Sequence, residues 1–427
     1  MDGLLLILSQ VAIMAGVALV FGGIALKLRQ PAVIGEILGG IIVGPSIFGM
    51  VSPELFSRVF PYKQCISDEF GYFIQAGMLL FMFMAGLEIN FSSLWRKRKA
   101  VIFTAIPSMI IPIIQGIIMV IVLKDIMYTS PKIGFAPFSV LIGIMFSISA
   151  LPVIVRILLD IKMIKTDLGT IILGAATLND LIGWTLFAAL MGIVVTNDAS
   201  ATTILISILR VGVFSFLVMY LGQKLSFKIL RCTKRFLSWP IGNILMIVFL
   251  IFGLSFMAEN LGIHPFFAVF ILGIAVRRTF RLKGTVIAKT FQNMALGLFA
   301  PLYFVSIGLK ANFILDFNLV LVISVLLIAC TGKIFGAGLG AYLAGLNLKN
   351  SLSIGFGLNA RGAIEIVIAS LAMDAQIIDH TLFVAFVIMS IVTSVISGSM
   401  LKFLNGRKEY NKECIESDVQ NELKNVG

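Results

Sequence analysis

Residues 168–196, LGTIILGAATLNDLIGWTLFAALMGIVVT, form a continuous apolar stretch in which Asp180 is the only ionisable side chain. As an α-helix this stretch would be about 44 Å long, which exceeds the roughly 30 Å hydrocarbon core of a bilayer. A charge at the bilayer centre costs at least about 2.5 kcal/mol, so such residues are usually kept for a function or a partner. The stretch therefore predicts a membrane-spanning helix that carries a functional carboxyl group at mid-depth.

The composition of the whole chain extends this prediction. Of the 427 residues, 59% are hydrophobic and 13% are charged, and the mean hydropathy is +1.05. Soluble domains average roughly 45–50% apolar and about 25% charged residues, so a soluble globule and a disordered chain are both excluded. The apolar runs are continuous rather than alternating, which disfavours a β-barrel. We predict an all-α polytopic membrane protein.

Thirteen apolar segments have the character expected of membrane-spanning helices. The first begins beside the N-terminus without a preceding cationic segment, so we interpret it as a retained span. The predicted spans are 3–26, 33–50, 70–90, 100–123, 136–158, 168–196, 203–223, 241–258, 263–276, 291–309, 317–345, 353–372 and 382–401.

Lysine and arginine are distributed unequally between alternate loops. With the N-terminus outside, the loops that would face the cytosol carry 25 of the 33 basic residues, and the outer loops carry five. The other three, Arg210, Lys333 and Arg361, lie inside spans. Cytoplasmic loops collect Lys and Arg, so this bias predicts an N-out, C-in orientation. We expect the polar tail at 405–427 to be cytosolic and too short for a nucleotide-binding domain.

A glycine-rich run, GAGLGAYLAG at 336–345, superficially resembles a dinucleotide-binding loop. It lies inside an apolar span, and no strand precedes it. We therefore interpret its small residues as a surface for close helix–helix packing.

One predicted span, 136–158, contains a residue that interrupts a helix. Pro152 has no backbone N–H, and its ring clashes with the carbonyl group of residue 148. A carbonyl oxygen freed in this way, together with the hydroxyl groups of Ser147 and Ser149, could coordinate a cation. We predict a discontinuous helix with a cation-binding break.

A second predicted span, 353–372, is weakened at its middle. Glycines that include Gly357 and Gly362 surround Asn359 there. This span and 136–158 would run in opposite directions, because seven spans separate them. Interrupted helices at corresponding positions of two inverted repeats point to a binding site at the membrane midplane.

Asp180 is the strongest candidate for the ion-binding group. A single buried carboxylate can hold a proton or a dehydrated monovalent cation, and each disfavours the other. Thr177 lies one helical turn away on the same face, and Asn179 is the adjacent residue. The alternative interpretation is a protonated Asp180 that forms a structural hydrogen bond across helices.

Four further charged residues are predicted to lie within the membrane. Lys333 is either a structural partner of Asn179 and Asp180 or a displaceable internal cation, and both interpretations place it near Asp180. Arg361 and Glu365 are spaced i, i+4 and could neutralise each other. Glu36 is a rival partner for Arg361. We interpret these last three residues as mainly structural, because they could hold the broken helix and its dipoles.

Together these residues resemble the monovalent cation:proton antiporter superfamily, with the closest likeness to the branch of Kef-type proteins and plant cation/H⁺ exchangers. The likeness runs from about residue 26 to about residue 401. The motifs that carry it are QPAVIGEILGGIIVGPS at 30–46, FMAGLE at 83–88, ND at 179–180, ENLGIH at 259–264, LYFVSIGL at 302–309, GK at 332–333 and LNARG at 358–362.

The resemblance implies a particular architecture. A core domain from about 100–196 and 317–404 would contain two crossed, discontinuous helices. A dimerisation or scaffold domain would comprise about 1–99 and 203–309, followed by the tail at 405–427. The resemblance also implies a homodimer in a lipid bilayer, a multi-pass position in the cell membrane, in bacteria the plasma membrane, and elevator-type movement of the core.

The resemblance further implies a secondary antiporter that exchanges Na⁺ or K⁺ for H⁺ and contributes to pH homeostasis. Asp180 would match the ion-carrying carboxylate, Asn179 its paired position, and Lys333 the lysine close to that pair. Many electrogenic relatives carry aspartate in place of Asn179, so an electroneutral exchange is expected here. The alternative is a Kef-like potassium efflux channel. We expect no enzymatic activity, no cofactor, no resident metal other than the transported cation at Asp180, and no nucleic-acid partner.

Overall fold

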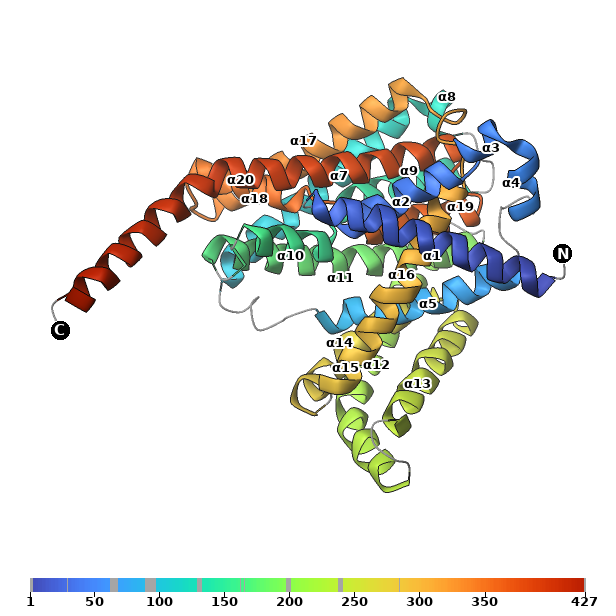
Figure 1. The fold of residues 1–427 in the computed structure, drawn as a ribbon, viewed down its shortest axis with the longest axis horizontal. Coiled ribbons are helices and arrows are strands. Elements are labelled where there is room, and N and C mark those ends of the chain that lie inside the picture. Colours follow the sequence, from blue (N-terminus) through green and yellow to red (C-terminus); the bar gives the residue numbers. More distant parts are fainter. Residues whose placement is uncertain are drawn as a thin grey trace.

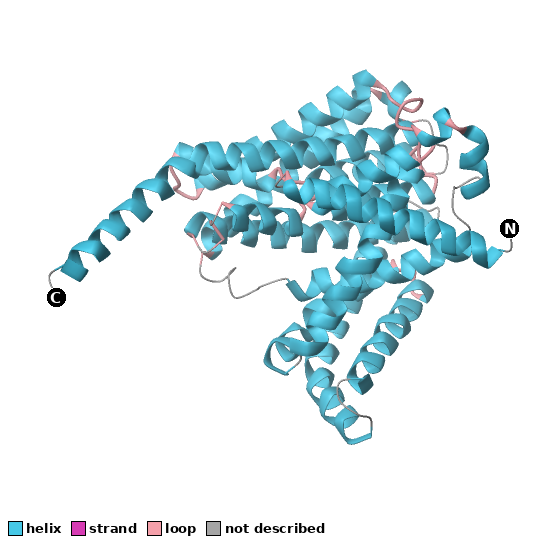
Figure 2. Cartoon of the chain, viewed as in Figure 1, coloured by secondary structure: helices cyan, strands magenta, loops and turns pink. Residues whose placement is uncertain are grey.

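The computed structural model describes residues 3–28, 30–61, 68–88, 97–128, 133–161, 163–164, 166–196, 201–236, 241–283 and 285–425. These residues form helices joined by loops and include no strand, which confirms the predicted all-α class (Figure 2). The elements are α1 (Gly3–Lys27), α2 (Ala32–Val43), α3 (Phe48–Val51), α4 (Pro53–Val59), α5 (Asp68–Glu88), α7 (Arg98–Val122), α8 (Lys124–Met127), α9 (Phe135–Ser147), α10 (Leu151–Asp160), α11 (Asp167–Thr196), α12 (Ala201–Phe236), α13 (Ile241–Asn260), α14 (Pro265–Lys283), α15 (Thr285–Met294), the π-helix η1 (Ala295–Phe299), α16 (Ala300–Leu309), α17 (Leu319–Leu343), α18 (Leu348–Leu358), α19 (Ala363–Asp374) and α20 (His380–Asn425).

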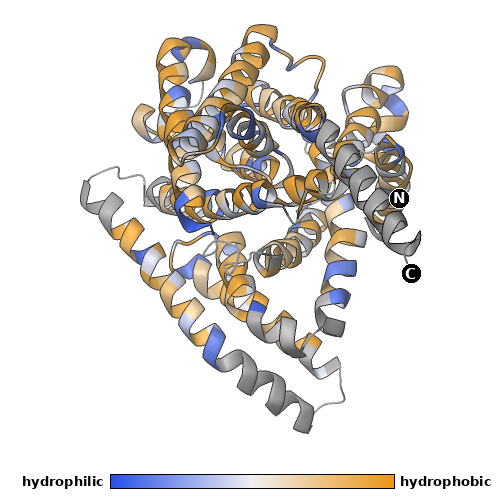
Figure 3. Cartoon of the chain, turned by 90° about the vertical axis from the view of Figure 1, so that its left-hand side faces the viewer, coloured by the Kyte–Doolittle hydropathy of each residue, from blue (hydrophilic) through white to orange (hydrophobic). Residues whose placement is uncertain are grey.

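The described helices have the length and the surface of a multi-pass membrane protein. Among the described residues, nine helical segments are long and apolar enough to cross a membrane, and three shorter apolar helices accompany them. Hydrophobic residues predominate along most helices (Figure 3), and many are exposed, among them Leu19, Phe249 and Phe335. Large exposed apolar surfaces are rare on soluble monomers, whereas lipid tails cover them readily. The total of thirteen spans and the N-out orientation stay predictions.

Two groups of helices share one order of elements. In each group a long helix is followed by a helix that is interrupted in its middle and then by a second long helix. The first group is α7, α9–α10 and α11, and the second is α17, α18–α19 and α20. The two groups meet because α17 packs along α7 and α18 packs against α11 (Figure 1). This order is the one that two structural repeats would give.

The other long helices pack mainly among themselves. α14 packs against α5 and α12, and α2 packs against α1 and α16. In Figure 1, α12 to α15 lie below the two repeated groups. The connection between the two regions includes contacts of α11 with α12 and α14. We propose that the two regions correspond to a core and a scaffold domain, because most helices pack within their own region.

Glycines on one side of α17 bring it into close contact with α7. A Cβ atom at Gly336 would lie 2.6 Å from the Pro107 carbonyl oxygen, and one at Gly340 would lie 2.1 Å from that of Phe103. The interpretation of the glycine-rich run as a helix-packing surface is therefore confirmed. The close approach also sets the rotation of α17, so that Lys333 points toward α9 and α11.

Polar side chains mark where three helices of the second group begin. Asn318 accepts a hydrogen bond from the Leu321 N–H at the start of α17, at 3.1 Å. Asn347 caps the start of α18, and Asp379 caps the start of α20. Such caps satisfy N–H groups that have no partner inside the helix.

Candidate functional site

The two helix breaks lie against each other, which confirms the pairing that the sequence predicted. The first separates α9 from α10 at residues 148–150, and the second separates α18 from α19 at residues 359–362. The Ala150 N–H donates to the Ala360 carbonyl oxygen at 3.1 Å, and the Ser149 hydroxyl donates to that of Leu358 at 2.9 Å. Each break therefore satisfies part of the polar backbone that the other exposes.

Two of the predicted helix-breaking residues lie beside the breaks rather than in them. Pro152 is the second residue of α10, a position where its missing N–H costs no helical hydrogen bond, and its side chain lies outside the described residues. Gly357 belongs to the last turn of α18 and packs against Ile172. The helix continues through Leu358, so the second break begins two residues after Gly357.

Gly362 does lie at the second break, directly before α19. A Cβ atom there would come within 2.7 Å of the Val153 side chain on α10. A larger side chain at this position would push the two breaks apart.

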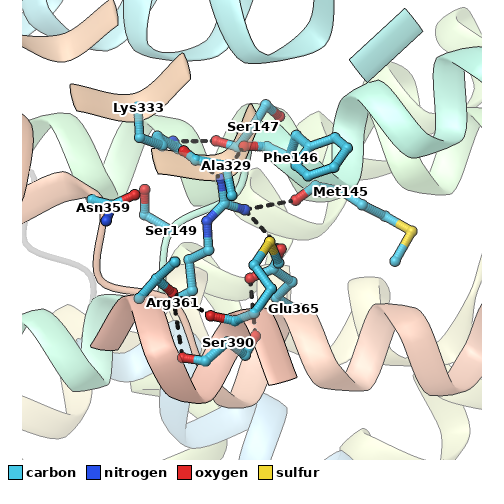
Figure 4. A network of polar contacts seen from close by, with 12 residues as sticks. Met145, Phe146, Ser147, Ser149, Ala329, Lys333, Asn359, Arg361, Glu365 and Ser390 are labelled. Carbon is cyan, nitrogen blue, oxygen red and sulfur yellow. Dashed lines mark hydrogen bonds and ion pairs between the residues drawn. The ribbon is translucent and has the colours of Figure 1, made fainter. Parts of the chain in front are cut away.

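The end of α9 leaves four backbone carbonyl groups without helical partners inside the membrane. The Ser147 hydroxyl donates to the Ile144 carbonyl at 2.8 Å. Arg361 donates to the Met145 carbonyl at 3.3 Å and to the Phe146 carbonyl at 2.7 Å (Figure 4). The Lys333 ammonium donates to the fourth, the carbonyl of Ser147. All four carbonyl groups are therefore satisfied, and two cationic side chains cover the negative end of the helix dipole.

Arg361 is fully buried and forms an ion pair with Glu365 at 2.7 Å. The other carboxylate oxygen of Glu365 accepts from the Ser390 hydroxyl at 3.1 Å, and the Ser394 hydroxyl donates to the Arg361 carbonyl group. These bonds join the start of α19 to α20. Glu365 also lies in the first turn of α19, where a negative charge complements the helix dipole.

Glu36 lies elsewhere in the fold. It is on α2, and its side chain packs against Gly22 of α1. The proposed pairing of Glu36 with Arg361 is therefore wrong, and the i, i+4 alternative with Glu365 holds. Sequence spacing could identify a partner on the same helix, but it could not place two helices relative to each other.

Lys333 and Asn179 lie together behind the breaks. Both are fully buried, from α17 and α11 respectively. When the Asn179 amide is oriented so that both its ends are satisfied, its oxygen accepts from Lys333 at 3.2 Å and from the Ser108 hydroxyl at 2.9 Å. The amide nitrogen then donates to carbonyl groups of Ala105 and Ala175, at 3.3 Å each. The predicted proximity of Lys333 to Asn179 is confirmed.

Asp180 is enclosed by protein, with 1% of its surface exposed, and does not face lipid. Its carboxylate interacts with the charge of Lys333 and with the backbone N–H of Leu151, the first residue of α10. A carboxylate is favoured at a helix N-terminus because N–H groups point toward it. Among the described residues, its Oδ1 atom has no hydrogen-bond partner. This oxygen can therefore accept a proton or a cation.

The other predicted ligands are buried around these groups. The Thr177 hydroxyl donates to the Leu173 carbonyl group on its own helix, at 2.8 Å. Its oxygen keeps lone pairs, as do those of Ser147 and Ser149. Asn359 donates to the Cys330 sulfur at 3.7 Å, and its side-chain oxygen has no partner among the described residues.

Sequence reasoning missed four groups of this site. Ser108 and the Leu151 N–H contact Asn179 and Asp180, while Ser390 and Ser394 hold the start of α19. A single serine in an apolar helix gives no signal of its own. Only the packing of α7 and α20 against the breaks brings these groups to the site.

Comparisons with known proteins agree with this geometry. Residues 15–405 match the family described as sodium/hydrogen exchanger, transmembrane. Cation/H⁺ antiporter 17 of Arabidopsis thaliana is 31% identical over 397 residues, which cover 91% of this chain and 47% of that protein. Na⁺/H⁺ antiporter NhaS4 of Synechocystis sp. is 30% identical over 404 residues, which cover 93% of this chain and 97% of that protein. This chain thus spans about half the length of the plant relative and nearly all of NhaS4.

A solved structure has the same overall fold. The sodium proton antiporter MjNhaP1 from Methanocaldococcus jannaschii, determined at pH 8, aligns with a TM-score of 0.69 over 94% of this chain and 98% of that one. The aligned residues are 16% identical, so the likeness concerns the fold alone.

Proposed function

Because this chain belongs to the sodium/hydrogen exchanger family, we propose that it exchanges protons for a monovalent cation, Na⁺ or K⁺, across a lipid bilayer. The relatives named above are antiporters, which are transporters rather than enzymes, and this chain is likewise a multi-pass membrane protein. Exchange requires one site that either ion can occupy but that both cannot occupy together.

The free oxygen of Asp180 is the observation that carries this proposal. It is buried beside the first break and has no hydrogen-bond partner among the described residues, so an arriving ion need not displace an existing hydrogen bond from it. A proton on the carboxyl group removes the negative charge that attracts the cation. A bound cation in turn opposes protonation of the same group. The two ions therefore displace each other.

We propose that the oxygen atoms of Ser147, Ser149 and Thr177 complete the cation shell, because hard cations prefer oxygen ligands. Asn179 has a different role in this proposal. Its amide oxygen accepts a hydrogen bond from Lys333. The ammonium group therefore stays beside Asp180 without bonding to the Oδ1 atom of its carboxylate. Asn359 contributes a further free oxygen at the second break.

In this structure Asp180 is closed off from water, so transport requires states that open the site to each side in turn. We propose that the two repeated groups of helices move together as an elevator relative to a scaffold of α1–α5 and α12–α16, within a homodimer. A contribution to pH homeostasis across the bacterial plasma membrane follows from such an exchange.

Reconstitution of the purified protein into liposomes tests the exchange. With a pH-sensitive dye inside acid-loaded vesicles, addition of Na⁺ or K⁺ is expected to raise the internal pH, and protein-free liposomes serve as the control. Half-maximal concentrations for Na⁺, K⁺ and Li⁺ identify the preferred ion. Cation flux without any proton movement would contradict the proposal and favour the Kef-like efflux channel.

We further expect the exchange to be electroneutral, because position 179 carries Asn179 and leaves Asp180 as the one carboxylate of the pair. An imposed potential of about 100 mV acts with roughly 2.3 kcal/mol on every net charge moved. One-for-one exchange moves no net charge, so its rate should not change with potential. The measurement compares initial rates at imposed potentials with the pH gradient held constant. A clear dependence on potential would show that this stoichiometry is wrong.

A further inference from the structure

Four polar side chains join α16 to α19 at a distance from the ion site. Lys310 follows α16 directly, and its ammonium group contacts both carboxylate oxygens of Asp374, the last residue of α19, at 2.7 and 2.8 Å. The same ammonium group donates to the Ser370 hydroxyl at 2.7 Å. Tyr303 shares a hydrogen bond with Ser370. We call these four residues the α16–α19 clasp.

The clasp lies on the same side of the molecule as the N-terminal part of α1. Three residues beyond α16, Asn312 donates to the carbonyl group of Pro45, which lies two residues after α2, at 3.3 Å. The segment that follows α2 in turn reaches α1, because Gln10 donates to the Val59 carbonyl at 2.8 Å. We call this side the N-terminal side. The N-terminus and α19 both lie at the right in Figure 1.

The clasp connects helices that otherwise pack with different neighbours. α16 packs against α1, α2 and α5, whereas α19 packs against α9 and α20. α19 also begins at the break beside Arg361, so it is one half of the ion-binding arrangement. A displacement of the broken helix relative to α16 must therefore separate Lys310 from Asp374.

Aromatic contacts also connect a helix of the repeated groups, α11, with α14 and the residue before it. On α11, Trp184 packs against Phe270 of α14, and Phe187 lies 6.3 Å from the His264 ring. Aromatic surfaces can slide over each other with little loss of contact. An ammonium group bound by two carboxylate oxygens and a hydroxyl keeps good hydrogen-bond geometry over a much smaller range of positions than a pair of aromatic rings does. The clasp is therefore suited to define one discrete position.

We propose that the α16–α19 clasp is a latch that keeps Asp180 closed toward the N-terminal side. This inference rests on the proposed exchange, because only a transporter has to open its site to each side in turn. The latch must break before the carboxyl group can reach water on that side. It re-forms when the site closes. Its strength therefore sets the fraction of protein molecules whose ion site is open to the N-terminal side.

Thiol labelling from each side of the membrane tests this latch. The reporter is Ala188→Cys, a buried position two turns beyond Asp180 on α11 toward the N-terminal side, in a background that lacks the native cysteines. A membrane-impermeant methanethiosulfonate reagent is applied to spheroplasts and to inverted vesicles.

Loss of a surface ion pair removes up to about 1 kcal/mol, so Lys310→Gln should raise labelling from the N-terminal side roughly fivefold. Labelling from the opposite side should not rise. Exchanging the two charges, Lys310→Asp with Asp374→Lys, should restore the slow rate.

The ion pair between Lys97 and Asp167 provides a matched control. It joins α7 to α11 at 2.9 Å and is at least as exposed as the latch, but both helices belong to the repeated groups. Lys97→Gln should leave labelling from both sides unchanged. If Lys310→Gln does not raise labelling from the N-terminal side, or raises it equally from both sides, the latch is refuted. Exchange by the unaltered protein is measured separately, so failure of the latch and failure of the antiport function are distinguishable.

Discussion

Asp180→Asn is expected to reduce cation/proton exchange to the background of protein-free liposomes. Asparagine has nearly the same shape and can still accept the Leu151 N–H, so the break should keep its geometry. The amide, however, can neither take up a proton near neutral pH nor offer a negative charge to a cation. Both halves of the exchange depend on the same oxygen, so they should be lost together. The measurement is the dye assay of internal pH, with Na⁺ and K⁺ tested separately.

Asp167→Asn is the control for this result. Asp167 is on the same helix as Asp180, but its side chain is 67% exposed and pairs with Lys97 at the surface. Its replacement should leave the exchange rate nearly unchanged. Thermal unfolding in detergent should show that Asp180→Asn remains folded. Full exchange in a folded Asp180→Asn protein would refute the mechanism and restore the interpretation of Asp180 as a structural residue.

The features that the sequence predicted correctly have a local signal. Asp180 and Lys333 are rare charges at the middle of long apolar runs, and such charges are costly in a membrane. Arg361 and Glu365 pair because residues four apart share a helix face. The paired breaks could be recognised because two spans carried helix-interrupting residues at corresponding depths. These arguments require only the neighbouring sequence.

The features that were missed depend on packing between distant segments. Gly357 lies in the last turn of α18, just before the break, and packs against Ile172 of α11. Glu36 cannot pair with Arg361, because α2 packs against α1 and α16. Ser108 reaches Asn179 only because α7 packs against α11. A single sequence does not show which helix faces meet, so such contacts lie beyond its reach.

Replacement of Arg361 should have the opposite effect from replacement of Asp180: it should lower the stability of the protein rather than abolish exchange by the folded protein. Arg361→Met removes the partner of a buried carboxylate and the donors to two carbonyl groups at the end of α9. Removal of one member of a buried ion pair typically costs about 3–5 kcal/mol. We therefore expect a large fall in thermal stability and in the yield of folded protein. The measurement is the unfolding temperature in detergent, followed by exchange per folded molecule.

A double replacement separates the two contributions of this pair. Arg361→Met with Glu365→Gln removes the unpaired negative charge, so part of the lost stability should return. The carbonyl groups of Met145 and Phe146 would still lack their donor, so recovery should be incomplete. Molecules that fold should retain measurable exchange, because neither side chain contacts the free oxygen of Asp180. If Arg361→Met instead unfolds at the normal temperature and loses exchange completely, Arg361 acts in transport, and its assignment as a mainly structural residue is wrong.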